Sequence, residues 1–251
     1  MFIQAVPITS PTNAWVKELS PLWLPAGKPD IWLEPTETSN WVTYGETINS
    51  IGFYTGSGLT VGDSFDPLEV SPPDASTPAD YRYINSSVSY DKNEPGPFPA
   101  AADLSSATVI AVMYQENNPS FAEINLSLAG VGLQAKNVGD GITAITNTDA
   151  GAGDYAAVDG MGLYNQVWKV YAATFEPDGV EIKVNYYLNG SSYGSETTIG
   201  YTWASTATAT NVTLQGFNDF QFGTMVRYPR VLDADEMTTV YNHLSSYYPV
   251  S

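Results

Sequence analysis

Two acidic segments of the sequence could supply oxygen ligands for a metal ion. The first contains Asp63 and Asp66 in GDSFDPLE, and the second contains Asp140 and Asp149 in the glycine-rich stretch at 139–160. Calcium is bound by carboxylate and carbonyl oxygens of this kind. Neither segment has the spacing of an EF-hand, and Asp and Gly also form ordinary turns by bonding their own backbone. Turn formation is therefore favoured, with Ca²⁺ as the alternative; no other cofactor is expected.

Aromatic and polar residues outside regular apolar patterns could bind a carbohydrate. Aromatic faces pack on the C–H groups of sugars, while amides and carboxylates bind the hydroxyls. The sequence has 6 Trp and 17 Tyr. The candidates are Trp41, Tyr155 and Trp203, which lie near Ser/Thr- or Gly-rich segments, and Asp154 beside Tyr155. For any one of the aromatic residues, burial under a loop or in a subunit interface is the favoured alternative.

Several classes of chemistry and partner are excluded by composition. The chain has no cysteine and a single histidine, His243, so thiolate chemistry and most Ser-His-Asp schemes are removed. The chain has 9 Lys and Arg residues and 27 Asp and Glu residues, which gives a formal charge of −18. Such a surface repels phosphate and anionic lipid, so we expect neither a nucleic-acid nor a membrane partner. The sequence also lacks an 18-residue apolar run, and its first residues do not resemble a secretory signal.

Strand patterns dominate the chain after residue 104. Residues Val180, Ile182, Val184 and Tyr186 alternate with polar residues, which is the period of a half-buried strand. Turn residues such as Leu188-Asn189-Gly190 separate neighbouring strands. Many antiparallel strands of similar length predict a two-sheet sandwich. The predicted strands are 107–115, 121–129, 131–138, 166–176, 180–190, 196–203, 211–217 and 222–232.

One helix is predicted at the C-terminal end. Asp233 and Glu236 have the spacing of a capping box, in which each side chain accepts a bond from the other's backbone N–H. An apolar stripe then recurs every three or four residues, and Pro249 ends the pattern. The stripe consists of Met237, Val240, Tyr241, Leu244 and Tyr248. It must face a core.

The chain divides into an arm and one domain. Residues 1–22 show no sustained period, and their apolar side chains could anchor the protein to a partner. The alternative is that this arm wraps over its own domain. The domain covers 23–251, with a proline-rich loop insertion around 56–103. The anchoring residues would be Phe2, Ile3, Val6 and Trp15.

Three segments together resemble one family. YNQVWKVYAATFEPDGVEIKVNYYLNG, FGTMVRYPRVLDADEMTTVYNHLSSYYP and PLWLPAGKPDIWLEP are similar to the central hairpin, the closing strand with its helix, and the opening strand of concanavalin A-like (laminin-G-like) jelly rolls. The last is typical of versions in bacteriophage structural and fibre proteins. The resemblance implies an all-β, two-sheet antiparallel jelly-roll sandwich with a short C-terminal helix.

The resemblance also allows catalysis to be tested. The glucanase branch of the family carries Glu-x-Asp-x-x-Glu on one strand, which supplies the nucleophile and the acid. The nearest match here, Glu123-Ile124-Asn125-Leu126-Ser127-Leu128, has one of the three acids. We therefore expect that the protein is not an enzyme.

From these observations we expect a non-enzymatic structural protein of a bacteriophage particle. It would be a capsid decoration or head fibre, or a tail fibre component, at the surface of the extracellular virion. Its partners would be other virion proteins, further copies of itself in a homo-oligomer, and host-surface carbohydrate. The alternative is a secreted or surface polysaccharide-binding module or glycanase.

Overall fold

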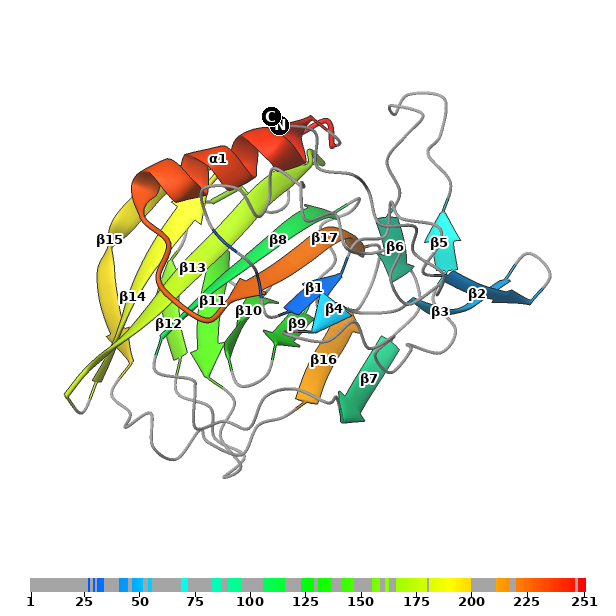
Figure 1. The fold of residues 1–251 in the computed structure, drawn as a ribbon, viewed down its shortest axis with the longest axis horizontal. Coiled ribbons are helices and arrows are strands. Elements are labelled where there is room, and N and C mark those ends of the chain that lie inside the picture. Colours follow the sequence, from blue (N-terminus) through cyan, green and yellow to red (C-terminus); the bar gives the residue numbers. More distant parts are fainter. Residues whose placement is uncertain are drawn as a thin grey trace, which may run out of the picture.

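The protein is a two-layer β-structure with one helix on its outside, shown in Figure 1. This computed structural model describes residues 27, 29, 31–33, 41–44, 47–51, 54–55, 69–71, 83–86, 90–95, 106–115, 123–128, 131–136, 141–146, 155–158, 161–162, 166–179, 181–199, 211–216, 220–246 and 248–251. Every statement below concerns this part of the chain.

The first layer is a nine-stranded sheet. Its main path runs β15-β14-β13-β8-β17-β1-β4, and β6 pairs with both β17 and β5. The strands are β1 (Ile31–Leu33), β4 (Tyr54–Thr55), β5 (Glu69–Ser71), β6 (Tyr83–Ser86), β8 (Ala107–Gln115), β13 (Lys169–Asp178), β14 (Glu181–Leu188), β15 (Ser191–Ile199) and β17 (Phe220–Tyr228). All of its pairings are antiparallel.

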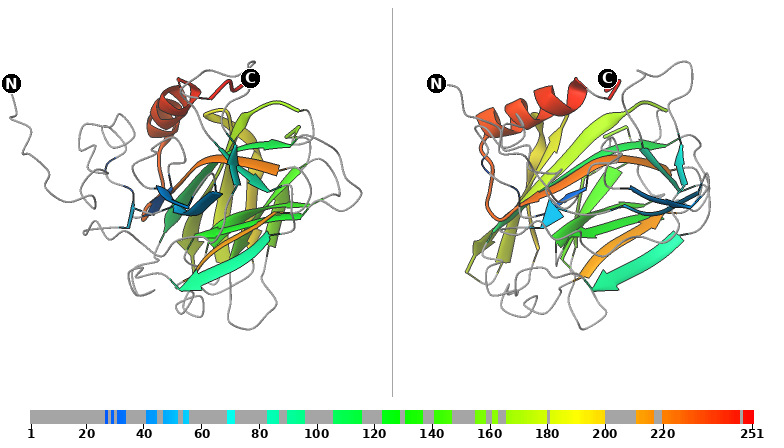
Figure 2. Two further views of the ribbon diagram at one scale, coloured as in Figure 1. Left: turned by 90° about the vertical axis from the view of Figure 1, so that its right-hand side faces the viewer. Right: turned by 45° about the vertical axis from the view of Figure 1, so that its right-hand side comes forward.

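The second layer is a six-stranded antiparallel sheet in the order β12-β11-β10-β9-β16-β7. Its strands are β7 (Tyr90–Pro95), β9 (Glu123–Leu128), β10 (Val131–Lys136), β11 (Gly141–Thr146), β12 (Tyr155–Val158) and β16 (Asn211–Gly216). A separate hairpin joins β2 (Trp41–Tyr44) to β3 (Thr47–Ile51). Figure 2 shows the two larger sheets face to face, with the helix on the far side of the nine-stranded sheet.

Side-chain alternation builds the core between the sheets. On β14, Ile182, Val184 and Tyr186 are buried while the residues between them are half-buried, as the sequence pattern predicts. β10 of the second sheet contacts both β8 and β13 of the first. Buried Val131 and Leu133 on β10 therefore lie in this interlayer core, where burial of each such side chain contributes about 1.5–3 kcal/mol.

The helix α1 (Ala234–Ser245) begins with the predicted capping box. The backbone N–H of Glu236 donates to Asp233 Oδ1 over 2.9 Å, and the backbone N–H of Asp233 donates to Glu236 Oε2 over 3.0 Å. The guanidinium of Arg230 also donates to the Glu236 carboxylate, with 2.7 Å from Nη1 to Oε2. The bond from Arg230 is the main reason why the pKa of Glu236 lies below its usual value.

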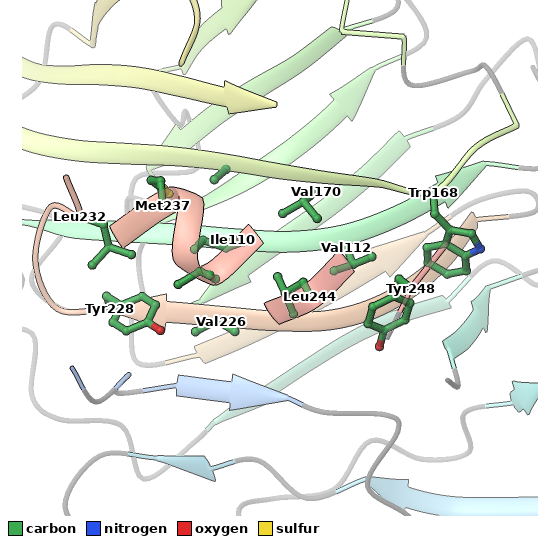
Figure 3. Packing of buried hydrophobic residues seen from close by; sticks show 12 residues of the cluster. Ile110, Val112, Trp168, Val170, Val226, Tyr228, Leu232, Met237, Leu244 and Tyr248 are labelled. Carbon is green, nitrogen blue, oxygen red and sulfur yellow. The ribbon is translucent and has the colours of Figure 1, made fainter. Parts of the chain in front are cut away.

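The apolar stripe of α1 packs on the outer face of the nine-stranded sheet, as Figure 3 shows. Met237, Val240 and Leu244 are buried, and Leu232 before the cap is buried with them. They meet strand residues that alternate with those of the interlayer core, namely Ile110, Val112, Val170, Ala172, Val226 and Tyr228. α1 thus covers the outer face of the nine-stranded sheet over β8, β13 and β17, and in the described part of the chain no helix lies on the outer face of the six-stranded sheet.

The last residues fix the far end of α1. Tyr248 is buried against Trp168, with ring centroids 5.4 Å apart, and its hydroxyl lies 3.1 Å from Thr224 Oγ1. A Cβ at Gly223 would come within 2.6 Å of the Tyr248 ring, so only glycine fits there. Asn189, in the left-handed region at φ 50°, donates from its amide to Ser251 O over 3.1 Å.

The predicted fold class is confirmed: an all-β antiparallel sandwich with a short C-terminal helix. Several details differ. α1 ends at Ser245, before Pro249, because the chain turns to bury Tyr248. β11 and β12 lie in the glycine-rich stretch at 139–160, where the sequence predicts no strand, and β5, β6 and β7 lie within the predicted loop insertion at 56–103. The arm at 1–22 lies outside the described residues.

Candidate functional site

The outer face of the six-stranded sheet can be assigned from the buried positions of its inner face. Val131 and Leu133 on β10 are buried, and so are Ile142 and Ala144 on β11. Because successive residues of a strand lie on opposite faces, the residues between them belong to the outer face. Cross-strand partners share a face, so the strand register extends this assignment across all six strands.

One row of outer positions crosses five strands without interruption. Asn125 on β9 pairs with Gln134 on β10 and with Gln215 on β16. Gln134 pairs in turn with Thr143 on β11, and Gln215 pairs with Asp91 on β7. The row therefore reads Asp91, Gln215, Asn125, Gln134, Thr143, and we call it the amide row. It places three carboxamide residues side by side between a carboxylate residue and a hydroxyl residue.

A second row of outer positions lies beside the amide row and changes character along its length. It begins with polar residues on β7, β16 and β9 and ends with apolar ones on β11 and β12. The sequence of positions is Asn93, Thr213, Ser127, Gly132, Ile145 and Tyr155. Gly132 is buried, as expected of a residue with no side chain to rise above its neighbours. The outer face thus has a polar part and, near β12, an apolar and aromatic end.

The residue types of the amide row suit a ligand rich in hydroxyl groups. A carboxamide both donates and accepts hydrogen bonds, as a sugar hydroxyl does. Neighbouring strands lie about 4.8 Å apart, so five positions span about 19 Å. An array of this length offers several groups to one elongated ligand, whereas a compact ion would use only one or two of them.

The acidic positions described on this face are too far apart to form a catalytic pair. Its described acidic positions are Asp91 in the amide row and Glu123 at the start of β9. They are separated by β16 and by two residues along the strand, so their Cα atoms are about 12 Å apart. Glu123 pairs in register with Lys136. Among the described residues no cluster of three metal-binding side chains occurs either.

Residues of the nine-stranded sheet contact β11, β12 and the chain after β12 from the inner side of the six-stranded sheet. The backbone N–H of Ala144 donates to Tyr186 Oη over 3.4 Å, and burial raises the pKa of that tyrosine. Lys169 is buried and donates from Nζ to Met161 O and Gly162 O over 3.0 and 2.9 Å. A Cβ at Gly194 of β15 would lie 3.1 Å from Val158 of β12. These contacts join β11 and the residues around β12 to the nine-stranded sheet.

The residues predicted from the sequence divide between the described part of the chain and the rest. Tyr155 begins β12 and occupies the aromatic end of the outer face. Trp41 begins β2, in the separate hairpin, and is not brought to this face by any strand pairing in the described part. The remaining candidates lie outside the described residues, namely Trp203, Asp154, Asp63, Asp66, Asp140, Asp149, Phe2, Ile3, Val6 and Trp15. All of these assignments remain predictions.

The amide row itself was missed by sequence reasoning. Each member is a polar residue at an alternate position of a strand, and that signal was visible for Asn125 and Gln134. However, Asp91 and Gln215 are more than 120 residues apart in sequence, and only the strand order β9-β16-β7 makes them neighbours.

Comparison with known proteins supports the fold and goes no further. No protein-family model matches the sequence, and no curated protein does. Among solved structures, the botulinum neurotoxin serotype D/C VPI 5993 binding domain is similar with a TM-score of 0.56 and 10% identity; 86% of this chain and 52% of that chain are covered. The receptor-binding domain of the mosaic serotype C/D neurotoxin has the same score and identity, with 85% and 50% covered.

The likeness has two limits that bear on function. At this identity it shows a shared β-sandwich fold alone, so no ligand of those domains is transferred by it. The chain spans about half the length of the structures that it matches. In the described part of the chain, no helix is long and apolar enough to cross a membrane.

Proposed function

We propose that the protein is a non-enzymatic carbohydrate-binding β-sandwich that binds glycans on the outer face of its six-stranded sheet. The observation that carries the proposal is the amide row, which places Gln215, Asn125 and Gln134 on three adjacent strands. Amides bind sugar hydroxyls, and the apolar end near Tyr155 suits the C–H face of a sugar ring. Two solved structures of the same fold are receptor-binding domains, and this agrees with a binding role.

The spacing of the described acidic positions on this face favours binding over hydrolysis. Glycosidases hold two carboxyl groups about 5 to 9.5 Å apart, on either side of the scissile bond. The described strands bring no two acids into neighbouring outer positions. A glycanase is therefore the less favoured alternative, and release of reducing ends from a bound polysaccharide would establish it.

We further propose that the sandwich is a concanavalin A-like jelly roll and that it is displayed on a bacteriophage particle as a homo-oligomer. The sequence resemblance at 21–35, 164–190 and 222–249 supports this setting. The arm at 1–22 would join the sandwich to other virion proteins. Deleting 1–22 should then abolish incorporation into particles while leaving the thermal unfolding of the domain unchanged. Normal incorporation of the shortened protein would contradict the virion role.

A glycan array tests the binding role directly. The double variant Asn125→Ala/Gln134→Ala removes two adjacent amides from the centre of the row. Its matched control is Asn242→Ala, which removes an exposed amide on α1, and Figure 2 shows that α1 lies on the far side of the nine-stranded sheet from the six-stranded one. We expect the wild type and the control to bind one class of glycan and the double variant to lose most of that binding. Equal binding by all three proteins would refute the assignment of this face.

A further inference from the structure

We propose that Asn189 is a site of spontaneous deamidation, and that the segment 248–251, which follows α1, slows this reaction in the folded protein. The inference concerns a covalent modification of the turn between β14 and β15 and does not depend on carbohydrate binding. It follows from three observations: the residue after Asn189, the hydrogen bonds of its amide, and the packing of the turn against α1.

Asn189 is followed by the residue that most favours deamidation. Asn189-Gly190 is the one Asn-Gly pair in the sequence. In this reaction the backbone nitrogen of Gly190 attacks Cγ of Asn189 and closes a five-membered succinimide ring. The Cγ–Nδ2 bond breaks, and the amide nitrogen leaves as ammonia with the proton of the Gly190 N–H. Water then opens the ring at either carbonyl and leaves aspartate or isoaspartate. Glycine favours the attack because no Cβ hinders the approach of its nitrogen.

The fold fixes the side chain of Asn189 on both sides. Asn189 and Gly190 form the tight turn between β14 and β15, with φ of 50° and 77°. The backbone N–H of Val170 donates to Asn189 Oδ1 over 2.9 Å, and Asn189 Nδ2 donates to Ser251 O over 3.1 Å. Ring closure makes the planar amide carbon tetrahedral and displaces both of these atoms. Both bonds therefore oppose it.

The bond to Ser251 is the more easily opened of the two. Ser251 is exposed and Asn189 is half-buried, so water competes for this bond, whereas the other bond of the amide is partly buried. The backbone N–H of Ser251 donates to Trp168 O over 3.1 Å, and Val250 forms a parallel bridge with Trp168. Local opening of the segment 248–251 thus releases one side of the amide and permits the reaction.

The products cannot restore these contacts. A carboxylate still accepts from the N–H of Val170, but it has no N–H to donate to Ser251 O, and two acceptor oxygens then face each other. Isoaspartate also adds one carbon to the backbone of the turn. The turn packs closely on α1, where a Cβ at Gly190 would lie 2.7 Å from Cβ of Tyr241. Deamidation should therefore loosen the segment after α1 irreversibly.

Peptide mapping by mass spectrometry measures the reaction in the whole protein, incubated at mildly alkaline pH below its melting temperature. Deleting 250–251 removes the acceptor of the Asn189 amide, so we expect deamidation there to become about three- to ten-fold faster. Ser251→Pro, which removes the N–H bonded to Trp168 O, should act in the same direction. Asn185, on β14 and followed by tyrosine, is the internal control whose rate neither change should raise.

The urea-unfolded chain supplies the reference rate, and thermal unfolding verifies that both variants are folded. Deamidation at Asn189 should be fastest in urea, where neither bond persists. Equal rates in the folded protein, the folded variants and the unfolded chain would overturn the protective role of the segment 248–251. If Asn189 stayed intact even in the unfolded chain, the site itself would be wrong.

Asn189→Asp reproduces one product and tests its effect on the segment. Hydrogen exchange of the Val250 and Ser251 amides, followed by mass spectrometry, should become about ten-fold faster. Ser195→Asp adds the same charge at an exposed position of β15 and should leave this exchange unchanged. Unchanged exchange in Asn189→Asp, or an equal effect of the two variants, would refute the link between the amide and the segment after α1.

Discussion

The hydroxyl of Thr108 is expected to hold the closing strand and the helix onto the sandwich. Thr108 lies on β8 with no exposed surface. Its Oγ1 donates to Arg230 O over 2.8 Å and accepts from the backbone N–H of Leu232 over 3.0 Å. Both partners belong to the connection between β17 and α1, which is 122 to 124 residues away in sequence. One side chain thus satisfies two backbone groups that a strand or helix would otherwise satisfy.

Replacing Thr108 by valine keeps the branched shape and removes both bonds. The buried N–H of Leu232 and the carbonyl of Arg230 are then left without this partner, and each such loss costs about 1–3 kcal/mol. Valine adds a methyl group in place of the hydroxyl and returns part of this, so we expect a loss of about 2–4 kcal/mol. With an m value of about 3 kcal/mol/M in urea, the midpoint of unfolding should fall by about 1 M.

The matched control is Thr238→Val on α1. Thr238 is also a threonine that bonds a backbone carbonyl, from Oγ1 to Ala234 O over 2.8 Å, but it is exposed. Water can replace that bond, so the substitution should change stability by less than about 0.5 kcal/mol. Urea unfolding followed by tryptophan fluorescence compares the two variants. If Thr108→Val lowered the midpoint no more than Thr238→Val does, the role assigned to this hydroxyl would be wrong.

Three further perturbations probe other parts of the structure. The bond from Arg230 lowers the pKa of Glu236 in the folded state. The stability that this bond contributes is therefore present above a pH of about 4.5 and is lost as the pH falls through the lowered pKa. The difference in unfolding free energy between wild type and Glu236→Gln, measured by urea unfolding, should shrink on acidification, and a constant difference would contradict this. Gly223→Ala should cost about 1–3 kcal/mol by overpacking against Tyr248, and the further change Tyr248→Ala should add less than it costs alone; additive losses would refute the contact. If the acidic segments bind Ca²⁺, adding millimolar Ca²⁺ should raise the melting temperature in calorimetry and Asp140→Asn should reduce that rise, whereas no shift would remove Ca²⁺ from the list of ligands.

Local sequence patterns predicted much of the fold. The capping box at Asp233 and Glu236 and the stripe from Met237 to Leu244 are short-range signals, since every partner lies within one or two helical turns. The alternation in β14 likewise predicted which residues would be buried. Such signals are readable because secondary structure has a fixed period.

Signals that depended on residue type alone were less reliable. No strand was predicted in the Gly- and Asp-rich stretch at 139–160, yet it contains β11 and β12. Gly, Asp and Ala disfavour strands by propensity, but β10 offers six register partners to β11, and pairing with a formed sheet outweighs propensity. Pro72, Pro73 and Pro78 lie between β5 and β6, and Pro95 is the last residue of β7, so the prolines at 56–103 do not exclude strands.

The sequence by itself determined the all-β class, the capped C-terminal helix and its buried stripe, and the acidic, cysteine-free composition that excludes several chemistries. These depend on periods and residue types that adjacent positions already display. Only the tertiary structure decided which polar positions of distant strands become register partners on one face of the six-stranded sheet. The amide row joins Asp91, Gln215 and Gln134 through the order of the strands, and that order is set by how two sheets and a helix bury their apolar faces together.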